Sequence, residues 1–139
     1  MRFVDASVFV HAYLKPNRRL SQTELDIKDN AKGIVARVNS GEKVMTTVVH
    51  LAEIANILED YLPLERALAV EEALLFKDSI NIAPVSREGC FAALQEVRER
   101  VVGLSDAVAY VTMKENCVAE VYSFDKDFDR FRDIRRISV

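Results

Sequence analysis

Four acidic residues stand where a folded protein has little structural use for a carboxylate. Asp5 comes directly after the apolar segment 2–4, and Asp125 comes shortly after a second such segment. Glu53 and Asp106 lie among mostly apolar residues, and no lysine or arginine lies within a helical turn of Glu53. Because burying an unpaired carboxylate costs free energy, these four residues are candidates for chemistry.

Each acid also has a purely structural explanation. Asp5 could be the N-cap of a following helix, and Asp106 falls in a first helical turn, where the helix dipole favours acids. Glu53 could form a salt bridge with a distant residue, and Asp125 could belong to a solvated turn with Asp127, which could reach the same cleft. Taken together, four carboxylates without matching cations would repel one another, and a hard divalent cation removes that conflict. All-oxygen ligation suits Mg²⁺ or Mn²⁺, and a chain with only two histidines argues against a zinc site of His and Cys.

The elements that carry these acids follow from the spacing of apolar residues. Short apolar runs predict strands, longer periodic segments predict helices, and Gly, Pro and Asn mark their ends. We predict strands at 2–4, 43–46, 80–83, 119–123 and 134–138. We predict helices at 6–14, 22–39, 47–60, 64–77, 87–101 and 105–116, with a short helical turn at 126–131. This alternation predicts a three-layer α/β/α sandwich with a central, mostly parallel sheet.

Parallel strands present their carboxyl ends at one edge of a sheet, where ligands bind in open α/β folds. Asp5 and Asp125 follow strands and are expected at that edge. With Ser105 as the N-cap, Asp106 would lie in the first turn of helix 105–116. The rest of this helix is mostly apolar, which places its N-terminus at the interior edge of the domain.

Glu53 lies inside the predicted helix 47–60, which is apolar around nearly its whole circumference. Its neighbours on the same face, four residues before and after, are Val49 and Ile57. A helix that is apolar all round is buried, so Glu53 is expected to point into the protein or into a cleft. The sequence therefore predicts one cluster of carboxylates, formed by Asp5, Glu53, Asp106 and Asp125.

The composition is that of an ordinary globular protein. The 139 residues suit one domain, predicted over 1–139, and 50% hydrophobic with 29% charged residues argues against disorder. The chain has no signal-peptide pattern and no apolar run of membrane-spanning length, so we expect a cytoplasmic protein. The two cysteines, Cys90 and Cys117, have no CxxC spacing and are expected to be reduced core residues.

The segments around the four acids also resemble a known family. FVDASVFV, TTVVHLAEIANIL, LSDAVAYVTM and VYSFDKDFDRF, in this order and at this spacing, resemble the PIN domain and in particular the VapC-type toxin ribonucleases. The resemblance spans nearly the whole chain and implies the PIN fold. It implies that Asp5, Glu53 and Asp106 are the three core acids, and that Asp125 is a fourth, more variable one.

The resemblance further implies Mg²⁺- or Mn²⁺-dependent endonucleolytic cleavage of RNA, with the four acids as catalytic and metal-binding residues. A carboxylate-held metal would generate hydroxide from water and stabilise charge on the phosphate oxygens. Asp106 or Asp125 could serve as the general base. Ser7 stands beside the first acid, and Ser123, where the family often has a Thr, could hold the adjacent acid or a metal-bound water.

Three kinds of partner are expected. Since the net charge is −3, RNA would have to be drawn by the metal and by local arginines, for which the candidates are Arg18, Arg19, Arg98, Arg100, Arg130 and Arg132. Helix 64–77, with Tyr61 and Leu62, carries more apolar side chains than one core face needs, which favours a homodimer. By resemblance alone, a VapB-type antitoxin would cover the acidic cleft, with an arginine inserted among the carboxylates.

Other functions are distinguishable by sequence or by metal binding. A haloacid-dehalogenase-like phosphatase needs a second acid two residues after Asp5, where this chain has Ser7. A receiver domain needs an aspartate after a middle strand, where this chain has Thr46 and Thr47. The alternatives left open are a catalytically silent PIN-like module that binds protein or RNA, and a non-toxin PIN nuclease of RNA processing. A silent module need not bind a metal.

Overall fold

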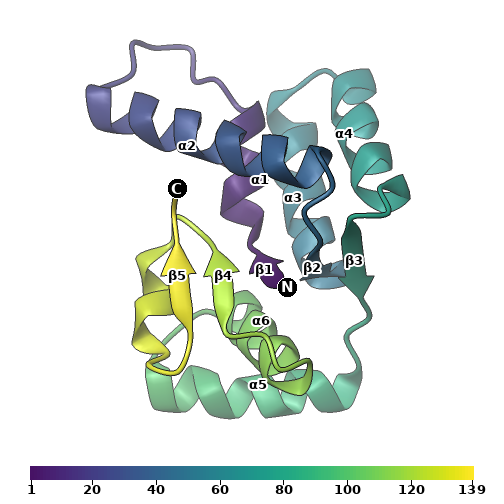
Figure 1. Ribbon diagram of the computed structural model, residues 1–139, viewed down its shortest axis with the longest axis vertical. Helices are drawn as coiled ribbons and strands as arrows, with labels where there is room; N and C mark the ends of the chain where they lie inside the picture. Colours follow the sequence, from purple (N-terminus) through teal and green to yellow (C-terminus); the bar gives the residue numbers. More distant parts are fainter.

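Five short strands form one sheet in the computed structural model, which describes all residues, 1–139 (Figure 1). The strands are hydrogen-bonded in the order β3-β2-β1-β4-β5, and every pairing is parallel. Their bounds are β1 (Arg2–Val4), β2 (Val44–Thr47), β3 (Ile80–Ala83), β4 (Glu120–Tyr122) and β5 (Arg135–Ile137). The predicted parallel sheet is therefore confirmed.

Helices cover both faces of this sheet. Their bounds are α1 (Ala6–Tyr13), α2 (Gln22–Asn39), α3 (Val48–Tyr61), α4 (Leu64–Phe76), α5 (Arg87–Arg100) and α6 (Leu104–Glu115), with the 3₁₀ helix η1 (Lys126–Arg130). Figure 1 shows α1 to α4 gathered above the strands and α5 with α6 below them. The three-layer α/β/α sandwich is thus confirmed. None of the helices combines the length and apolar character needed to cross a membrane.

Two separate cores hold the layers together, because successive strand residues point to opposite faces. On β1, Val4 belongs to the core under α1 to α4, whereas Phe3 belongs to the core under α5 and α6. Val44 and Met45 of β2 divide in the same way, as do Tyr122 and Val121 of β4. The central strands are consequently buried on both sides, and only their ends are open to polar chemistry.

The strand order reverses between β1 and β4. From β1 the chain continues to β2 and β3 on one side of the sheet, and then crosses to β4 and β5 on the other. In open α/β sheets, the crevice at such a reversal, outside the carboxyl ends of the strands, is where ligands bind. Asp5 and Ser123 directly follow the two strands that meet there.

Three local expectations are wrong. Ser105 is not an N-cap, because α6 begins at Leu104 and the Gly103 carbonyl accepts the first helical hydrogen bond, from the N–H of Ala107 at 3.1 Å. The two cysteines are not core residues. Cys117 is exposed in the tight turn after α6, where its φ is positive, and Cys90 is half-buried. Both thiols are free, as expected.

Helix α3 is not buried all round. A single stripe, formed by His50, Ile54 and Leu58, lies in the interior, and the other apolar side chains of the helix are partly accessible. Glu53 is half-buried beside this stripe. The third wrong expectation is therefore the full burial of this helix, although the predicted orientation of Glu53 towards a cleft is confirmed by the cavity described below.

Candidate active site

A cavity of about 200 Å³ opens at the strand reversal and brings the four predicted acids together. Each acid reaches it from a different segment: the end of β1, the second turn of α3, the first turn of α6, and the start of η1. The lining consists of Asp5, Ala6, Ser7, Val10, His11, Glu53, Ile57, Asp106 and Asp125. The predicted clustering of these carboxylates is what the structure shows.

Asp5 is 5% exposed, and its two carboxylate oxygens have different surroundings. The Oδ2 atom accepts hydrogen bonds from Ser7 Oγ at 2.6 Å, from Ser123 Oγ at 2.8 Å and from the Ser7 backbone N–H at 3.3 Å. As the N-cap of α1, Asp5 also fulfils its structural explanation. The Oδ1 atom accepts no hydrogen bond from the protein, so it is the oxygen available to a cation.

Two serine hydroxyls join the ends of β1 and β4. Ser7 Oγ accepts a hydrogen bond from the Phe124 N–H at 3.1 Å, and Ser123 Oγ accepts one from the Asp125 N–H at 3.0 Å. Because both hydroxyls donate to Asp5, they fix this carboxylate relative to the segment that carries Asp125. Ser123 therefore contacts both acids that follow strands.

Glu53 and Asp106 are the acids with the least compensation. The Oε2 atom of Glu53 is buried without a hydrogen-bond partner, and burial, followed by the charges of Asp5 and Asp125, raises its pKa. Asp106 is 8% exposed, and burial together with the neighbouring carboxylates raises its pKa to about 7. Both groups are held in a place where a proton or a cation is needed to offset their charge.

Asp125 is the most accessible of the four acids. It caps η1, and its Oδ1 atom accepts a hydrogen bond from the Asp127 N–H at 2.9 Å. Asp127 is half-buried and lies 3.7 Å from Arg130 in an ion pair. The third acid of this segment, Asp129, is instead bound to Arg136 at 2.9 Å and does not line the cavity.

The possible ligand atoms form two groups. Carboxylate or ring atoms of Asp5, His50 and Glu53 lie within 4.8 Å of one another, and so do carboxylate atoms of Asp106, Asp125 and Asp127. Several carboxylate oxygens so close together match the ligands that Mg²⁺ and Mn²⁺ prefer. The Glu53 Oε2 atom, which has no hydrogen-bond partner, is free to bind such a cation. The donor set therefore suits one or two hard divalent cations.

His50 is the residue of this site that the sequence analysis missed. It is 0% exposed, and its Nε2 atom lies 3.9 Å from Asp5 Oδ1. A signal was present, because His50 precedes Glu53 by three residues and so shares its helix face. From the sequence alone, the low number of histidines argues against zinc and predicts no role for His50.

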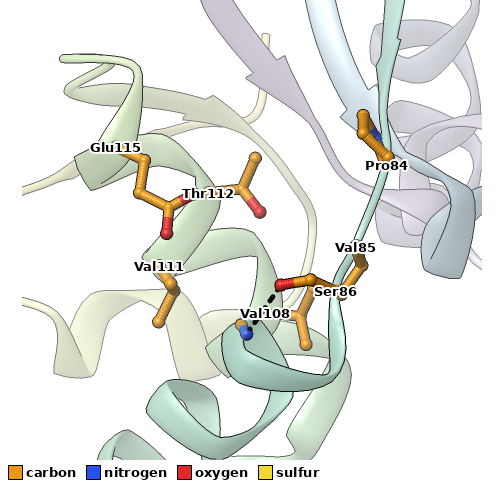
Figure 2. A pocket seen from close by; sticks show the side chains of 8 residues that line it. Pro84, Val85, Ser86, Val108, Val111, Thr112 and Glu115 are labelled. Carbon is orange, nitrogen blue, oxygen red and sulfur yellow. Dashed lines mark hydrogen bonds between the residues drawn. The ribbon is translucent and has the colours of Figure 1, made fainter.

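A larger cavity, of about 300 Å³, lies apart from the acids (Figure 2). It lies between α6 and the segment from the end of β3 to the start of α5, and its lining is Pro84, Val85, Ser86, Gly89, Val108, Val111, Thr112 and Glu115. Its one carboxylate, that of Glu115, has no acidic neighbour in the lining. The Ser86 hydroxyl caps α5 by accepting a hydrogen bond from the Gly89 N–H at 3.0 Å. The larger cavity therefore lacks the convergence of carboxylates that marks the candidate site.

A sequence profile described as the PIN domain matches residues 2–134. The solved structure of Mycobacterium tuberculosis VapC20, described as a sarcin–ricin-loop-cleaving toxin, superposes with a TM-score of 0.75 at 20% identity, covering 96% of this chain and 97% of that one. FitAcB from Neisseria gonorrhoeae superposes with a TM-score of 0.64 at 15% identity, covering 99% and 96% of the two chains.

A toxin–antitoxin complex from Klebsiella pneumoniae is also similar, with a TM-score of 0.61 at 13% identity over 91% of this chain and 88% of that one. At these identities the three structures show a shared fold. No curated protein matches the sequence.

Proposed function

The chain belongs to the PIN domain family, and on that premise we propose that it is a Mg²⁺- or Mn²⁺-dependent endoribonuclease that hydrolyses RNA phosphodiester bonds. One observation carries the proposal: carboxylates from four separate segments converge on one cavity that no lysine or arginine lines, and a buried oxygen of Glu53 has no hydrogen-bond partner there. Asp5, Glu53, Asp106 and Asp125 are the proposed catalytic and metal-binding residues. The similarity to VapC20, which is described as a sarcin–ricin-loop-cleaving toxin, supports the toxin assignment.

Asp5 would bind the cation through Oδ1, because Oδ2 is occupied by three donors. Glu53 would bind through the buried Oε2 atom, which has no other partner. When bound, a divalent cation lowers the pKa of water and offsets charge on the phosphate. Asp106 or Asp125 is then placed to accept the proton of the attacking water, and the accessible position of Asp125 keeps it in reach of substrate.

RNA must approach an acidic cavity on a protein of net charge −3. Three of the six candidate arginines are already engaged: Arg18 with Glu24, Arg100 with Glu96, and Arg130 with Asp127 and the carbonyl of Val101. The other three, Arg19, Arg98 and Arg132, form no ion pair within the protein. We therefore assign phosphate contacts to these three.

A homodimer is proposed through the outer surface of α4. Figure 1 shows this helix at the periphery of the molecule, next to α3. Ala67 and Leu74 pack into the core, whereas a second set of apolar side chains is exposed: Tyr61, Leu64, Leu68, Leu75 and Phe76. Such a patch is larger than an isolated exposed apolar residue and is typical of a subunit interface.

We further propose an antitoxin partner of the VapB type and a cytoplasmic location. The similar complex from Klebsiella pneumoniae pairs a toxin with an antitoxin, which supports this assignment. An arginine side chain inserted into the cavity would offset the charge of Asp5, Glu53 and Asp106 and compete with the cation for the same oxygens. A non-toxin PIN nuclease and a silent binding module remain the alternatives.

The test measures metal binding and cleavage together. Wild-type protein, the double variant Asp5→Asn/Asp106→Asn, and the control Glu115→Gln are titrated with Mn²⁺ by calorimetry and assayed on single-stranded RNA. The control removes a carboxylate from the larger cavity, so it is expected to bind and cleave as the wild type does. We expect the double variant to lose both properties. Wild-type protein that binds no Mn²⁺ at millimolar concentration would contradict the nuclease assignment and favour the silent module.

A further inference from the structure

We propose that His50 is a positioning residue of the acidic site, held as the neutral tautomer with its proton on Nε2 and directing that N–H towards Asp5. In this role it restrains the Asp5 oxygen that faces the cation, and it does not itself bind the cation. The inference rests on the proposed metal-dependent function. It adds a residue that neither the four-acid pattern nor the family assignment supplies.

The ring of His50 is fixed by its surroundings. It lies in the first turn of α3, is 0% exposed, and meets the ring of Phe3 edge-on, with centroids 5.0 Å apart and an interplanar angle of 77°. Since Phe3 belongs to the central strand β1, the imidazole is held between α3 and the strand that ends at Asp5. The direction of its two nitrogens is therefore set by the fold.

Thr47 determines the tautomer. Its Oγ1 atom accepts hydrogen bonds from the backbone N–H groups of Val49 at 3.2 Å and His50 at 3.3 Å, as the N-cap of α3. The same atom lies 2.7 Å from His50 Nδ1. A hydroxyl has two acceptor lone pairs and one hydrogen. Because both lone pairs are used, the hydrogen is donated to Nδ1, and the neutral ring carries its own proton on Nε2.

The protonated nitrogen faces the acids. Nε2 has no hydrogen-bond partner and lies 3.9 Å from Asp5 Oδ1, too far for a hydrogen bond and close enough for attraction between the N–H dipole and the carboxylate. Burial lowers the pKa of His50, whereas the charge of Asp5 and a hydrogen-bonding contribution from the backbone carbonyl of Ser105 raise it. These two groups therefore both face the ring.

Three acid-bearing segments thus meet at one side chain. His50 belongs to the helix of Glu53, contacts Asp5, and faces Ser105, the residue before Asp106. Asp5 Oδ2 is held by three donors, whereas Oδ1 accepts no hydrogen bond and has the Nε2 atom of His50 3.9 Å away. A nitrogen can bind a cation only through a free lone pair, and the proton on Nε2 occupies that position. His50 consequently acts through Asp5.

The first experiment reads the tautomer in wild-type protein. With only two histidines in the chain, a long-range ¹H–¹⁵N correlation spectrum contains two imidazoles, and a His11→Gln variant assigns them. We expect His50 to be protonated on Nε2 both without metal and at saturating Mg²⁺. A proton on Nδ1, or loss of the Nε2 proton when Mg²⁺ binds, would overturn the inference and make His50 a ligand.

The second experiment measures Mn²⁺ affinity by calorimetry in two variants. His50→Leu removes the N–H, and partners of this kind are worth about 10- to 100-fold in metal affinity. His50→Gln places an amide N–H near the former Nε2 and is expected to recover most of the loss. Equal weakening in both variants, at matched thermal stability without metal, would overturn the donor role, as would unchanged affinity in His50→Leu. Wild-type protein that binds neither Mg²⁺ nor Mn²⁺ would overturn the metal site itself, and the inference with it.

Discussion

The carboxylate of Asp5 shows how one residue can serve structure and chemistry at once. It caps α1 through Oδ2 and leaves Oδ1 without a hydrogen bond from the protein. The two explanations that the sequence left open for this residue are therefore compatible, because each uses a different oxygen. The division is possible because Oδ2 has its own hydrogen-bond donors, and Ser123, which directly follows β4, provides one of them.

Ser123 is expected to be required for metal affinity. Ser123→Ala removes the donor to Asp5 Oδ2 and the acceptor for the Asp125 N–H, which leaves a polar group without its partner and costs about 1–3 kcal/mol of stability. We expect Mn²⁺ binding, measured by calorimetry, to weaken by roughly tenfold or more, as for other residues that orient metal ligands. Ser123→Thr keeps the hydroxyl and should retain most of the affinity.

Ser86→Ala provides the matched control for this prediction. It removes a serine that also accepts a backbone N–H, at the start of α5 beside the larger cavity. Loss of such a cap costs about 1 kcal/mol of stability, but metal affinity should not change. If Ser86→Ala and Ser123→Ala weaken Mn²⁺ binding equally, the effect of Ser123 is one of stability alone.

The raised pKa of Asp106 predicts that the stability of the metal-free protein falls as pH rises. Its pKa is raised to about 7 in the folded protein, so between its ordinary value and 7 the folded state binds a proton that the unfolded state has lost. The stabilisation is therefore complete at low pH and is lost as pH rises through 7. Since one pKa unit is worth about 1.4 kcal/mol, and since solvent reaches this cavity, we expect metal-free protein to lose on the order of 2 kcal/mol between pH 5 and pH 8.

Denaturant unfolding at the two pH values measures this difference directly. Asp106→Asn should reduce it, because the amide does not titrate. Saturating Mn²⁺ should reverse its sign, since a bound cation competes with protons and stabilises the folded protein more at pH 8. Metal-free wild-type protein that is more stable at pH 8 than at pH 5 would contradict the raised pKa of Asp106.

At the scale of elements, the sequence predicted the strands and helices to within about a residue or two, because each has a strong apolar period and clear end signals. The four acids could be found for the same reason, since they interrupt those periods. The start of α6 was less predictable, because Gly103 and Ser105 both suit an N-cap. Only the hydrogen bond from the Ala107 N–H to the Gly103 carbonyl decides between them.

The environment of His50 could not be predicted from the sequence. Its spacing from Glu53 places both on one helix face, but its contacts with Phe3, Asp5 and Ser105 come from other elements. Likewise, the apolar pattern of α3 did not reveal which side would be buried, because the neighbouring helices decide that. Tertiary contacts, rather than local pattern, therefore bring His50 into the site.

At the scale of the whole molecule, the two faces of the sheet have different roles. The layer of α1 to α4 supplies Glu53 and also carries the exposed apolar surface of α4, whereas the layer of α5 and α6 supplies Asp106. The cavity lies between them at the reversal of strand order, and none of its lining residues belongs to α4. A second subunit bound to α4 would thus leave the acids open to RNA.

The last prediction concerns this proposed dimer. Phe76 is 82% exposed on α4, and Phe91 is 63% exposed on α5 in the opposite layer. Phe76→Glu places a charge in the proposed interface, where burying it without a partner is costly, whereas Phe91→Glu adds the same charge outside it. Light scattering should give twice the chain mass of 15.7 kDa for the wild type and for Phe91→Glu. Phe76→Glu should give the mass of a single chain and still bind Mn²⁺. A wild-type protein that is monomeric at high micromolar concentration would contradict the interface while leaving the nuclease assignment untouched, because every acid of the cavity comes from one chain.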